Sequence, residues 1–236
     1  MIKQIIYTVF TLTLFLTSLN AQKSENQFDN NGKRHGFWTK DYYQTNQKRY
    51  EGTFKHGKEI DSFKFYTLSG GKSVLSAVKI FNEKDSIADV KFFASNKKVI
   101  SEGRMDGKRF VEKWVFYHKN SLEKMIVENY NSEGLLSGER FVYYLNGVLA
   151  ESAHYKDGKL DGEAKWFSEQ NKLLRHTFYK KDQLDGKTIY YGPDGIITSE
   201  GNYVMDQKKG VWKYYKDGKV TKEVDHTTQE VISKKE

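Results

Sequence analysis

The sequence predicts an all-β fold: an elongated single-layer antiparallel meander built from about eight stacked β-hairpin repeats of about 24 residues. Three observations support this prediction. A glycine recurs at fixed spacing, aromatic residues occur in pairs, and turn dipeptides separate runs of strand-forming residues. A fixed period in this range is typical of an array of small, similar units.

The glycine period is clearest in the second half of the chain, where four copies follow one another at intervals of 24 residues. Each glycine opens a similar phrase that ends in aromatic residues. The phrases are Gly138-Glu-Arg-Phe-Val-Tyr-Tyr, Gly162-Glu-Ala-Lys-Trp-Phe, Gly186-Lys-Thr-Ile-Tyr-Tyr and Gly210-Val-Trp-Lys-Tyr-Tyr.

Aromatic pairs extend this pattern over the whole chain. They are Tyr42-Tyr43, Phe65-Tyr66, Phe92-Phe93, Phe116-Tyr117, Tyr143-Tyr144, Trp166-Phe167, Tyr190-Tyr191 and Tyr214-Tyr215. The pairs indicate about eight units. The second half is regular, and insertions near residues 73–90 and 118–134 interrupt the first half.

Two kinds of turn alternate with the strands. Asn-Gly and Asp-Gly steps predict tight hairpins, because such turns need positive φ. One kind follows the aromatic pair, at Asn146-Gly147, Asp194-Gly195 and Asp217-Gly218. The other closes the unit, at His56-Gly57, Asp106-Gly107 and Asp157-Gly158, with Asp182-Gln183 and Asp206-Gln207 as degenerate copies.

The runs between turns are rich in β-branched and aromatic residues, as strands require. Examples are residues 149–155, 173–179 and 196–204. About sixteen strands at roughly 4.8 Å spacing give a ribbon on the order of 75 Å long. Period-2 alternation places Trp212 and Tyr214 on one face, with Val211, Lys213 and Tyr215 on the other. One face is therefore expected to be aromatic and the other mixed.

The chain begins with the layout of a secretory signal peptide. Lys3 precedes an uncharged apolar run over residues 5–19, and small residues end at Ala21. This run is shorter than the roughly 20 residues that span a bilayer, so cleavage after Ala21 is favoured over an uncleaved anchor. We expect a signal peptide at 1–21, a disordered polar leader at 22–34, the repeat array at 35–225 and a polar tail at 226–236, with residues 220–225 as the last strand.

Composition narrows the location and the partners. No second apolar run follows, so we expect no membrane span after signal removal, and the chain has no cysteine. Together with the Lys-, Asn- and Tyr-rich composition, this predicts an exported bacterial protein, periplasmic or extracellular. The net charge is +8, but the cations are spread among 31 acidic residues and form no basic stripe. We therefore expect no nucleic-acid partner.

Several phrases resemble the MORN repeat, and more closely its bacterial variant found in proteins of the YwqK-type antitoxin component family. They are Gly36-Phe-Trp-Thr-Lys-Asp-Tyr-Tyr, Glu51-Gly-Thr-Phe, Glu102-Gly-Arg-Met, Glu200-Gly-Asn-Tyr and Gly210-Val-Trp-Lys-Tyr-Tyr. The resemblance covers about residues 31–225 and is strongest over 135–220. It implies a β-hairpin array that contacts proteins or membrane lipids, without enzyme activity in the repeats. Residues 60–62 and 109–111 lack the opening glycine, so units two to four are expected to be distorted.

Catalysis, a metal and a cofactor are not predicted. The histidines have no metal-ligand spacing and no cysteine partner, so surface or turn positions are expected. They are His35, His56, His118, His154, His176 and His226. Glu51, Glu102, Glu151 and Glu200 recur at positions that look equivalent. Acid–base catalysis is one interpretation, but cross-strand pairing with Lys or Arg is favoured because the residues repeat with the unit.

Aromatic side chains are the candidate binding residues. They are Trp38, Tyr43, Trp114, Tyr143, Trp166, Tyr190, Trp212 and Tyr214. They could line a groove that stacks on sugar rings or holds an extended peptide, or they could pack on one another and hold the thin sheet together. Packing is favoured, with some rings serving both purposes.

Two functions of different classes follow from these patterns. The first is a non-enzymatic exported scaffold that binds a protein partner, in one version as an antitoxin-like immunity protein. The alternative is a binder of an envelope ligand, namely glycan, peptidoglycan or anionic lipid, through its aromatic rows.

Overall fold

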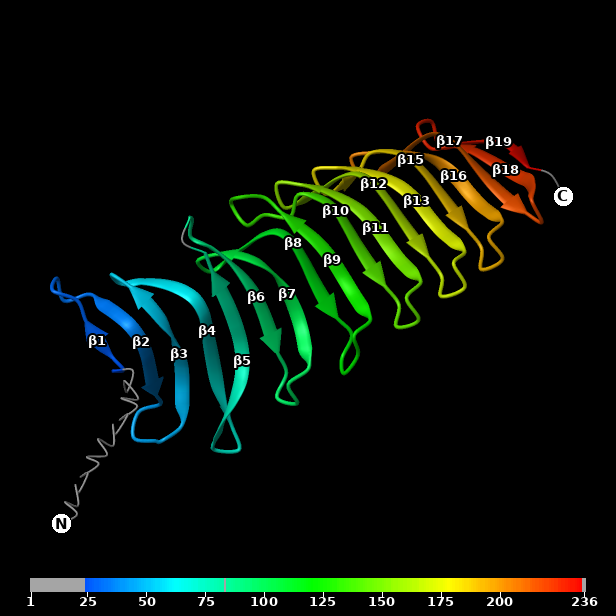
Figure 1. Cartoon of the computed structure of the whole chain (residues 1–236). Coiled ribbons are helices and arrows are strands. Elements are labelled where there is room, and N and C mark those ends of the chain that lie inside the picture. The colour runs from blue at the N-terminus through cyan, green and yellow to red at the C-terminus, as the bar shows by residue number, and fades with distance from the viewer. Residues whose placement is uncertain (1–23, 83, 235–236) are drawn as a thin grey trace, which may run out of the picture.

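The computed structural model describes residues 24–82 and 84–234, and the predicted signal peptide lies outside them. The described residues form one open antiparallel sheet of 19 strands and contain no helix (Figure 1). The predicted all-β meander is confirmed. Within this part of the chain we find no long apolar helix of the kind that crosses a bilayer.

The strands follow one another along the chain. Those of the first half are β1 (Gln27–Phe28), β2 (Arg34–Asp41), β3 (Lys48–Lys55), β4 (Lys58–Ser69), β5 (Lys72–Phe81), β6 (Ile87–Phe93), β7 (Val99–Asp106), β8 (Arg109–Tyr117) and β9 (Lys124–Tyr130). Those of the second half are β10 (Gly138–Tyr143), β11 (Leu149–Lys156), β12 (Lys159–Phe167), β13 (Leu173–Lys180), β14 (Gln183–Leu184), β15 (Gly186–Tyr191), β16 (Ile197–Val204), β17 (Gln207–Lys216), β18 (Lys219–Asp225) and β19 (Glu230–Lys234).

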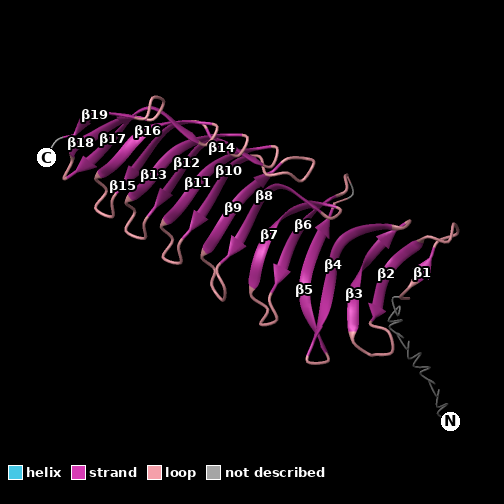
Figure 2. Ribbon diagram, turned by 180° about the vertical axis from the view of Figure 1, so that it is seen from behind, coloured by secondary structure: helices cyan, strands magenta, loops and turns pink. Residues whose placement is uncertain are grey.

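Each strand pairs with the next one along the chain, except at β14: this short strand pairs with β13, and β13 also pairs directly with β15. The sheet is a single layer, and the first and last strands lie at opposite ends of a long, twisted ribbon (Figures 1 and 2). Because every hairpin touches only its neighbours, stability is expected to depend on local packing between adjacent units.

A β-bulge marks the end of the first strand in each of eight hairpins. The register shifts lie at Lys40/Asp41, Phe65/Tyr66, Phe92/Phe93, Phe116/Tyr117, Val142/Tyr143, Trp166/Phe167, Tyr190/Tyr191 and Tyr214/Tyr215. These shifts define eight units, as predicted. They also show that the pairs Tyr42-Tyr43 and Tyr143-Tyr144 are out of step with the other six.

The opening position of the unit has a positive φ in two units that lack glycine there. In the second half this position holds glycine, for example Gly162 with φ 128° and Gly186 with φ 121°. In the first half Asp61 and Glu112 take its place with φ of 56° and 58°. The expected distortion is therefore absent at this position in units two and four, because Asp61 and Glu112 adopt the left-handed conformation found at the glycine positions. Unit three does differ, because Ala88 at the equivalent position has no positive φ.

Both ends of the array extend further than predicted. β1 lies within the segment expected to be a disordered leader and pairs with β2. β19 lies within the predicted polar tail and pairs with β18, so residues 220–225 are not the last strand. β1 is short and β19 is polar, so neither shows a clear alternation of apolar and polar residues in the sequence. Short or polar edge strands also protect a sheet from pairing with other chains.

Candidate functional site

One face of the sheet, here called the aromatic face, carries Phe63, Trp114 and Trp212. The strand register gives it a central row with one residue from each of sixteen strands. From β2 to β18 the row is Trp38, Gly52, Phe63, Lys79, Val90, Gly103, Trp114, Glu128, Arg140, Ala153, Ala164, Thr177, Thr188, Gly201, Trp212 and Val224.

Three units of this row pack a large ring onto a glycine of the preceding strand. The pairs are Phe63 on Gly52, Trp114 on Gly103 and Trp212 on Gly201, and the three rings are completely buried. A methyl group at Gly201 would lie 2.3 Å from Cδ2 of Trp212, so no other residue fits beneath the ring. The ring thus buries its area without a second layer of structure.

The two tryptophans of these pairs also satisfy a carbonyl group at a β-bulge. Nε1 of Trp114 donates to the carbonyl of Arg104 at 2.7 Å, and Nε1 of Trp212 donates to that of Asn202 at 3.1 Å. The register of each strand shifts at this point. The indole N–H therefore replaces a ladder bond that the bulge removes.

Between Arg140 and Gly201 the central row holds four small residues. Ala153, Ala164, Thr177 and Thr188 are all nearly or completely buried, and the two threonine hydroxyls are hydrogen-bonded to each other. Since these side chains are too small to cover the sheet, larger side chains from the flanking rows must shield them. Those side chains form the candidate binding surface.

Two cations lie on the rings of this surface. The guanidinium of Arg175 lies 4.2 Å from the centre of the Trp166 ring and contacts the hydroxyl of Tyr179. The ammonium of Lys208 lies 4.0 Å from the Trp212 ring and donates to the hydroxyl of Tyr214 at 3.3 Å. These are cation–π distances.

We define the aromatic patch as these side chains together with the rings between them. Its members are Trp166, Arg175, Tyr179, Tyr190, Tyr203, Lys208 and Tyr214. All seven side chains are half-buried, and Nε of Arg175 has no hydrogen-bond partner among the described residues. From Ala164 to Val224 the central row and its two flanking rows contain no carboxylate, and Glu151, beside Ala153, lies at the border of the patch. The patch is therefore aromatic and cationic.

A buried ion pair borders the patch. Arg140 lies in the central row and bonds Glu128 through Nε at 3.0 Å and Glu151 through Nη1 at 2.7 Å. Glu151 also accepts from Nε1 of Trp166 at 3.1 Å, and Glu128 accepts from the hydroxyl of Tyr130 at 2.5 Å. Burial, followed by the bond to Glu128, raises the pKa of Tyr130.

Glu151 corrects one sequence-based expectation. It pairs with a cation as predicted, but it is not equivalent to Glu51, Glu102 and Glu200. Each of those three is followed directly by the central-row residue of its strand, and so points to the opposite face. Glu151 lies two residues before the central-row residue Ala153, and so points to the aromatic face. The apparent spacing hides this shift because side-chain direction changes with every residue along a strand.

The other face, here called the charged face, carries the three remaining glutamates, each bound to a tyrosine of the next unit. The pairs are Glu51 with Tyr66 at 2.7 Å, Glu102 with Tyr117, and Glu200 with Tyr215 at 2.6 Å. Each glutamate also has a cross-strand lysine partner, as predicted: Lys64, Lys91 and Lys187, respectively. These carboxylates therefore have a structural role.

The Glu200–Tyr215 bond predicts a change in titration. The bond from Tyr215, followed by Lys187, lowers the pKa of Glu200, and the same bond raises the pKa of Tyr215 from 10.0 to about 12. The stabilisation by Glu200 is present above its ordinary pKa of 4.5 and is lost as the pH falls through the lowered value. The stabilisation by Tyr215 is present below pH 10 and is lost as the pH rises towards 12.

Glu200→Gln removes the carboxylate and should return the pKa of Tyr215 towards 10, so that this variant ionises one more tyrosine between pH 10 and 12 than the wild type. Ultraviolet absorbance of tyrosinate measures this difference. Glu163→Gln is the control, because Glu163 bonds Lys165 and His176 and no tyrosine. Superimposable titration curves for wild type and Glu200→Gln would contradict this account.

The eight predicted aromatic residues fall into different settings. Trp166, Tyr190 and Tyr214 belong to the aromatic patch. Trp114 and Trp212 have no exposed surface, so packing is their role and a ligand cannot stack on them.

The other three lie apart from the patch. Trp38 packs against Phe28 and Phe54 at the first end of the array. Tyr143 lies beside Phe141. Tyr43 is 88 % exposed in the turn after β2. The sequence reasoning missed Arg175 and Lys208, which only the register between strands brings over the rings.

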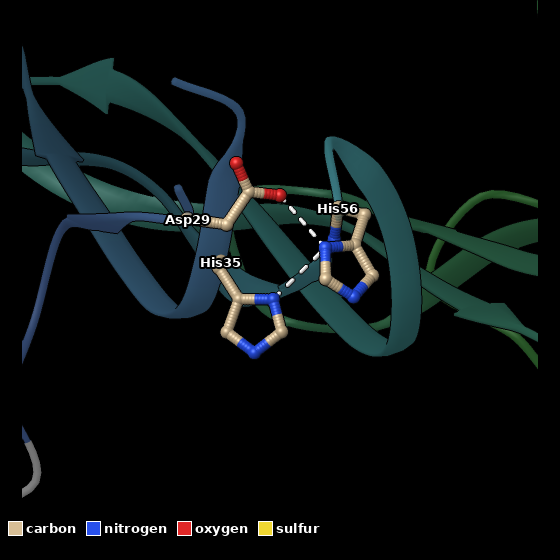
Figure 3. Close-up of side chains that lie close together, drawn as sticks. All are labelled: Asp29, His35 and His56. Carbon is tan, nitrogen blue, oxygen red and sulfur yellow. Dashed lines mark hydrogen bonds and ion pairs between the residues drawn. The ribbon is translucent and has the colours of Figure 1, made fainter. Parts of the chain in front are cut away.

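A second cluster lies at the first end of the array, where Asp29 and His56, each in a turn, lie close to His35 of β2 (Figure 3). Nδ1 of His56 lies 2.7 Å from Oδ2 of Asp29, and one possible ligand atom from each residue lies within 4.8 Å of the others. These residues could hold a metal ion. A metal site was not predicted from the sequence because His35 and His56 are 21 residues apart, and only the hairpin places them side by side.

Comparison with known proteins agrees with the hairpin units. The family model of the MORN repeat variant matches residues 136–157, 160–181 and 184–205. Each matched range coincides with one hairpin, namely β10–β11, β12–β13 and the hairpin that contains β15–β16. Three adjacent repeats of the chain thus match the MORN repeat variant. The aromatic patch is built largely on these matched repeats and on the unit that follows them.

Other comparisons add little. No curated protein matches the chain. Among solved structures, a chain in "Crystal Structure of TcdB2-TccC3-TEV" matches with 13 % identity and a TM-score of 0.19. The match covers 84 % of this chain and 14 % of that one. A superposition this loose says nothing of the function of the MORN repeats here.

Proposed function

We propose that the protein is a non-enzymatic repeat scaffold that binds a protein partner through the aromatic patch. The observation that carries the proposal is a set of half-buried rings and two ring-bound cations on an open sheet face, which no other described element covers (Figure 2). Tyr, Trp and Arg are the residue types that contribute most to protein interfaces. Because the patch contains no carboxylate, a partner with an acidic segment suits it.

The proposed location is the periplasm or the outside of the cell, where a signal peptide at residues 1–21 would deliver the chain. In the immunity version of the proposal, the partner is a toxin that acts in the same compartment. Sequencing the amino terminus of the protein from fractionated cells tests the location. A terminus at Gln22 in the exported fraction is expected, and a cytoplasmic protein that retains Met1 would contradict it.

The partner can be sought by affinity capture from cell-envelope extracts with wild type and Arg175→Ala/Tyr190→Ala. We expect the wild type to retain a specific protein that the variant binds at least about tenfold more weakly, since hot-spot residues contribute roughly 2 kcal/mol or more. Tyr43→Ala is the control, because this ring is exposed outside the patch. Equal capture by wild type and the patch variant, with both folded, would contradict the proposed surface.

An anionic envelope ligand is the second candidate, and Arg175 and Lys208 on the patch favour it. Such a ligand would bind by stacking and charge. Cosedimentation with cell wall or with vesicles containing anionic lipid separates the two candidates. Binding that is lost in Arg175→Ala/Tyr190→Ala would favour this candidate over a protein partner.

A further inference from the structure

We propose that Asp29, His35 and His56 form a binding site for a divalent transition metal of the zinc class at the first end of the array. Two imidazoles and one carboxylate are ligands that suit zinc, cobalt, nickel and copper. Calcium and magnesium need more oxygen ligands than this cluster offers.

The backbone already orients the carboxylate of this site. Oδ1 of Asp29 accepts from the backbone N–H groups of Asn31 and Lys33, each at 2.9 Å, which leaves Oδ2 directed at His56. The contact with His56, followed by the backbone bond from Lys33, lowers the pKa of Asp29 to about 2. The carboxylate is therefore charged at neutral pH, as a metal ligand must be.

The two histidines are accessible and close together. The exposed fraction of the His56 side chain is 62 %, and the His35 and His56 rings lie 4.8 Å apart between centres. Since Asp29 is ionised, Nδ1 of His56 carries the proton of the 2.7 Å contact. A metal ion would replace this proton, which moves to Nε2 or to solvent.

The ligands come from different hairpins, so binding would have a structural effect. Asp29 lies in the turn between β1 and β2, and His56 lies in the turn between β3 and β4 with φ of 49°. A shared ion would fasten the short edge strand to the second hairpin. Lys33, Lys55 and Lys58 lie nearby, and their charge disfavours cations held by charge alone.

Zinc titration of the full-length, tag-free protein by calorimetry, after removal of metal with EDTA, tests the site. We expect one equivalent of Zn²⁺ to bind, Co²⁺ to bind with a visible absorption band, and Ca²⁺ and Mg²⁺ not to bind. Zinc affinity should fall in acid, because protons compete with the metal ion for the imidazoles.

The variants His35→Ala and His56→Asn should each weaken zinc binding by roughly tenfold or more. Asparagine at position 56 tolerates the positive φ of the turn. His176→Ala is the matched control, because His176 also contacts a carboxylate at 2.7 Å but has no second histidine beside it. Its zinc affinity should equal that of the wild type.

Zinc should also raise the melting temperature of the wild type and of His176→Ala, but not of the two ligand variants. If His35→Ala is unfolded by circular dichroism, Asp29→Asn replaces it in the series. Absence of binding at 1 mM Zn²⁺, or equal affinity in the ligand variants and the wild type, would overturn the proposal.

Discussion

Gly201→Ala is expected to lower the free energy of unfolding by about 3 kcal/mol. The new methyl group would lie 2.3–2.5 Å from three atoms of the Trp212 ring, which is completely buried. The ring must therefore leave its place above the strand, which breaks its bond to the Asn202 carbonyl and exposes the sheet beneath. Denaturant unfolding followed by tryptophan fluorescence measures the effect.

Gly192→Ala is the matched control. Gly192 also has an ordinary φ, but a methyl group there meets only a carboxylate oxygen of Asp194 at 2.8 Å, at the end of a flexible side chain. The double variant Gly201→Ala/Trp212→Leu should lose less stability than the sum of the single variants, because both changes act on one contact. Additive losses, or a Gly201→Ala protein as stable as the Gly192→Ala protein, would refute the ring-on-glycine arrangement.

Trp114→Ala is expected to destabilise the protein by about 3 to 5 kcal/mol, the range for truncation of a large buried ring. Trp114 contacts Phe92, Phe110 and Phe116, and its indole N–H donates to the Arg104 carbonyl. Its removal leaves a cavity in the buried cluster that Trp114 forms with Ala88, Val90 and Met105, and an unpaired carbonyl.

The stability of this variant can be measured by denaturant unfolding followed by far-ultraviolet circular dichroism, which does not depend on the missing tryptophan. Tyr43→Ala is the control, because this exposed ring should contribute no more than about 0.5 kcal/mol. A loss below about 1 kcal/mol for Trp114→Ala would mean that the ring is not a central packing element.

Much of the fold could be predicted from the sequence because the hairpin signals are local. The turn at Asp157-Gly158, the strand over residues 149–155 and the alternation around Trp212 all depend on neighbours within a few residues. The end strands β1 and β19 were missed, since a strand of two residues or a polar edge strand lacks that local signal.

The candidate sites could be predicted only in part, because they depend on register between strands. The aromatic residues could be recognised in the sequence. Trp212 is completely buried and Trp166 is only half-buried, however, and this difference depends on the residue that faces each ring on the neighbouring strand. Likewise, a shift of one residue along the strand decides on which face the Glu151 side chain lies. It lies on the aromatic face beside Trp166, whereas Glu200 lies on the charged face. The cluster around His56 forms because two turns from different hairpins lie side by side. The residues of these turns are far apart in the sequence, so no local motif predicts the cluster.

The central claim is that the protein is one open, elongated sheet whose units pack only on their neighbours. Small-angle X-ray scattering tests it most directly. Strands spaced by roughly 4.8 Å give a particle roughly 80 Å long, with an expected radius of gyration of about 25 Å. A globular protein of this size would have a radius of about 17 Å, and a monomer with that value would contradict the account.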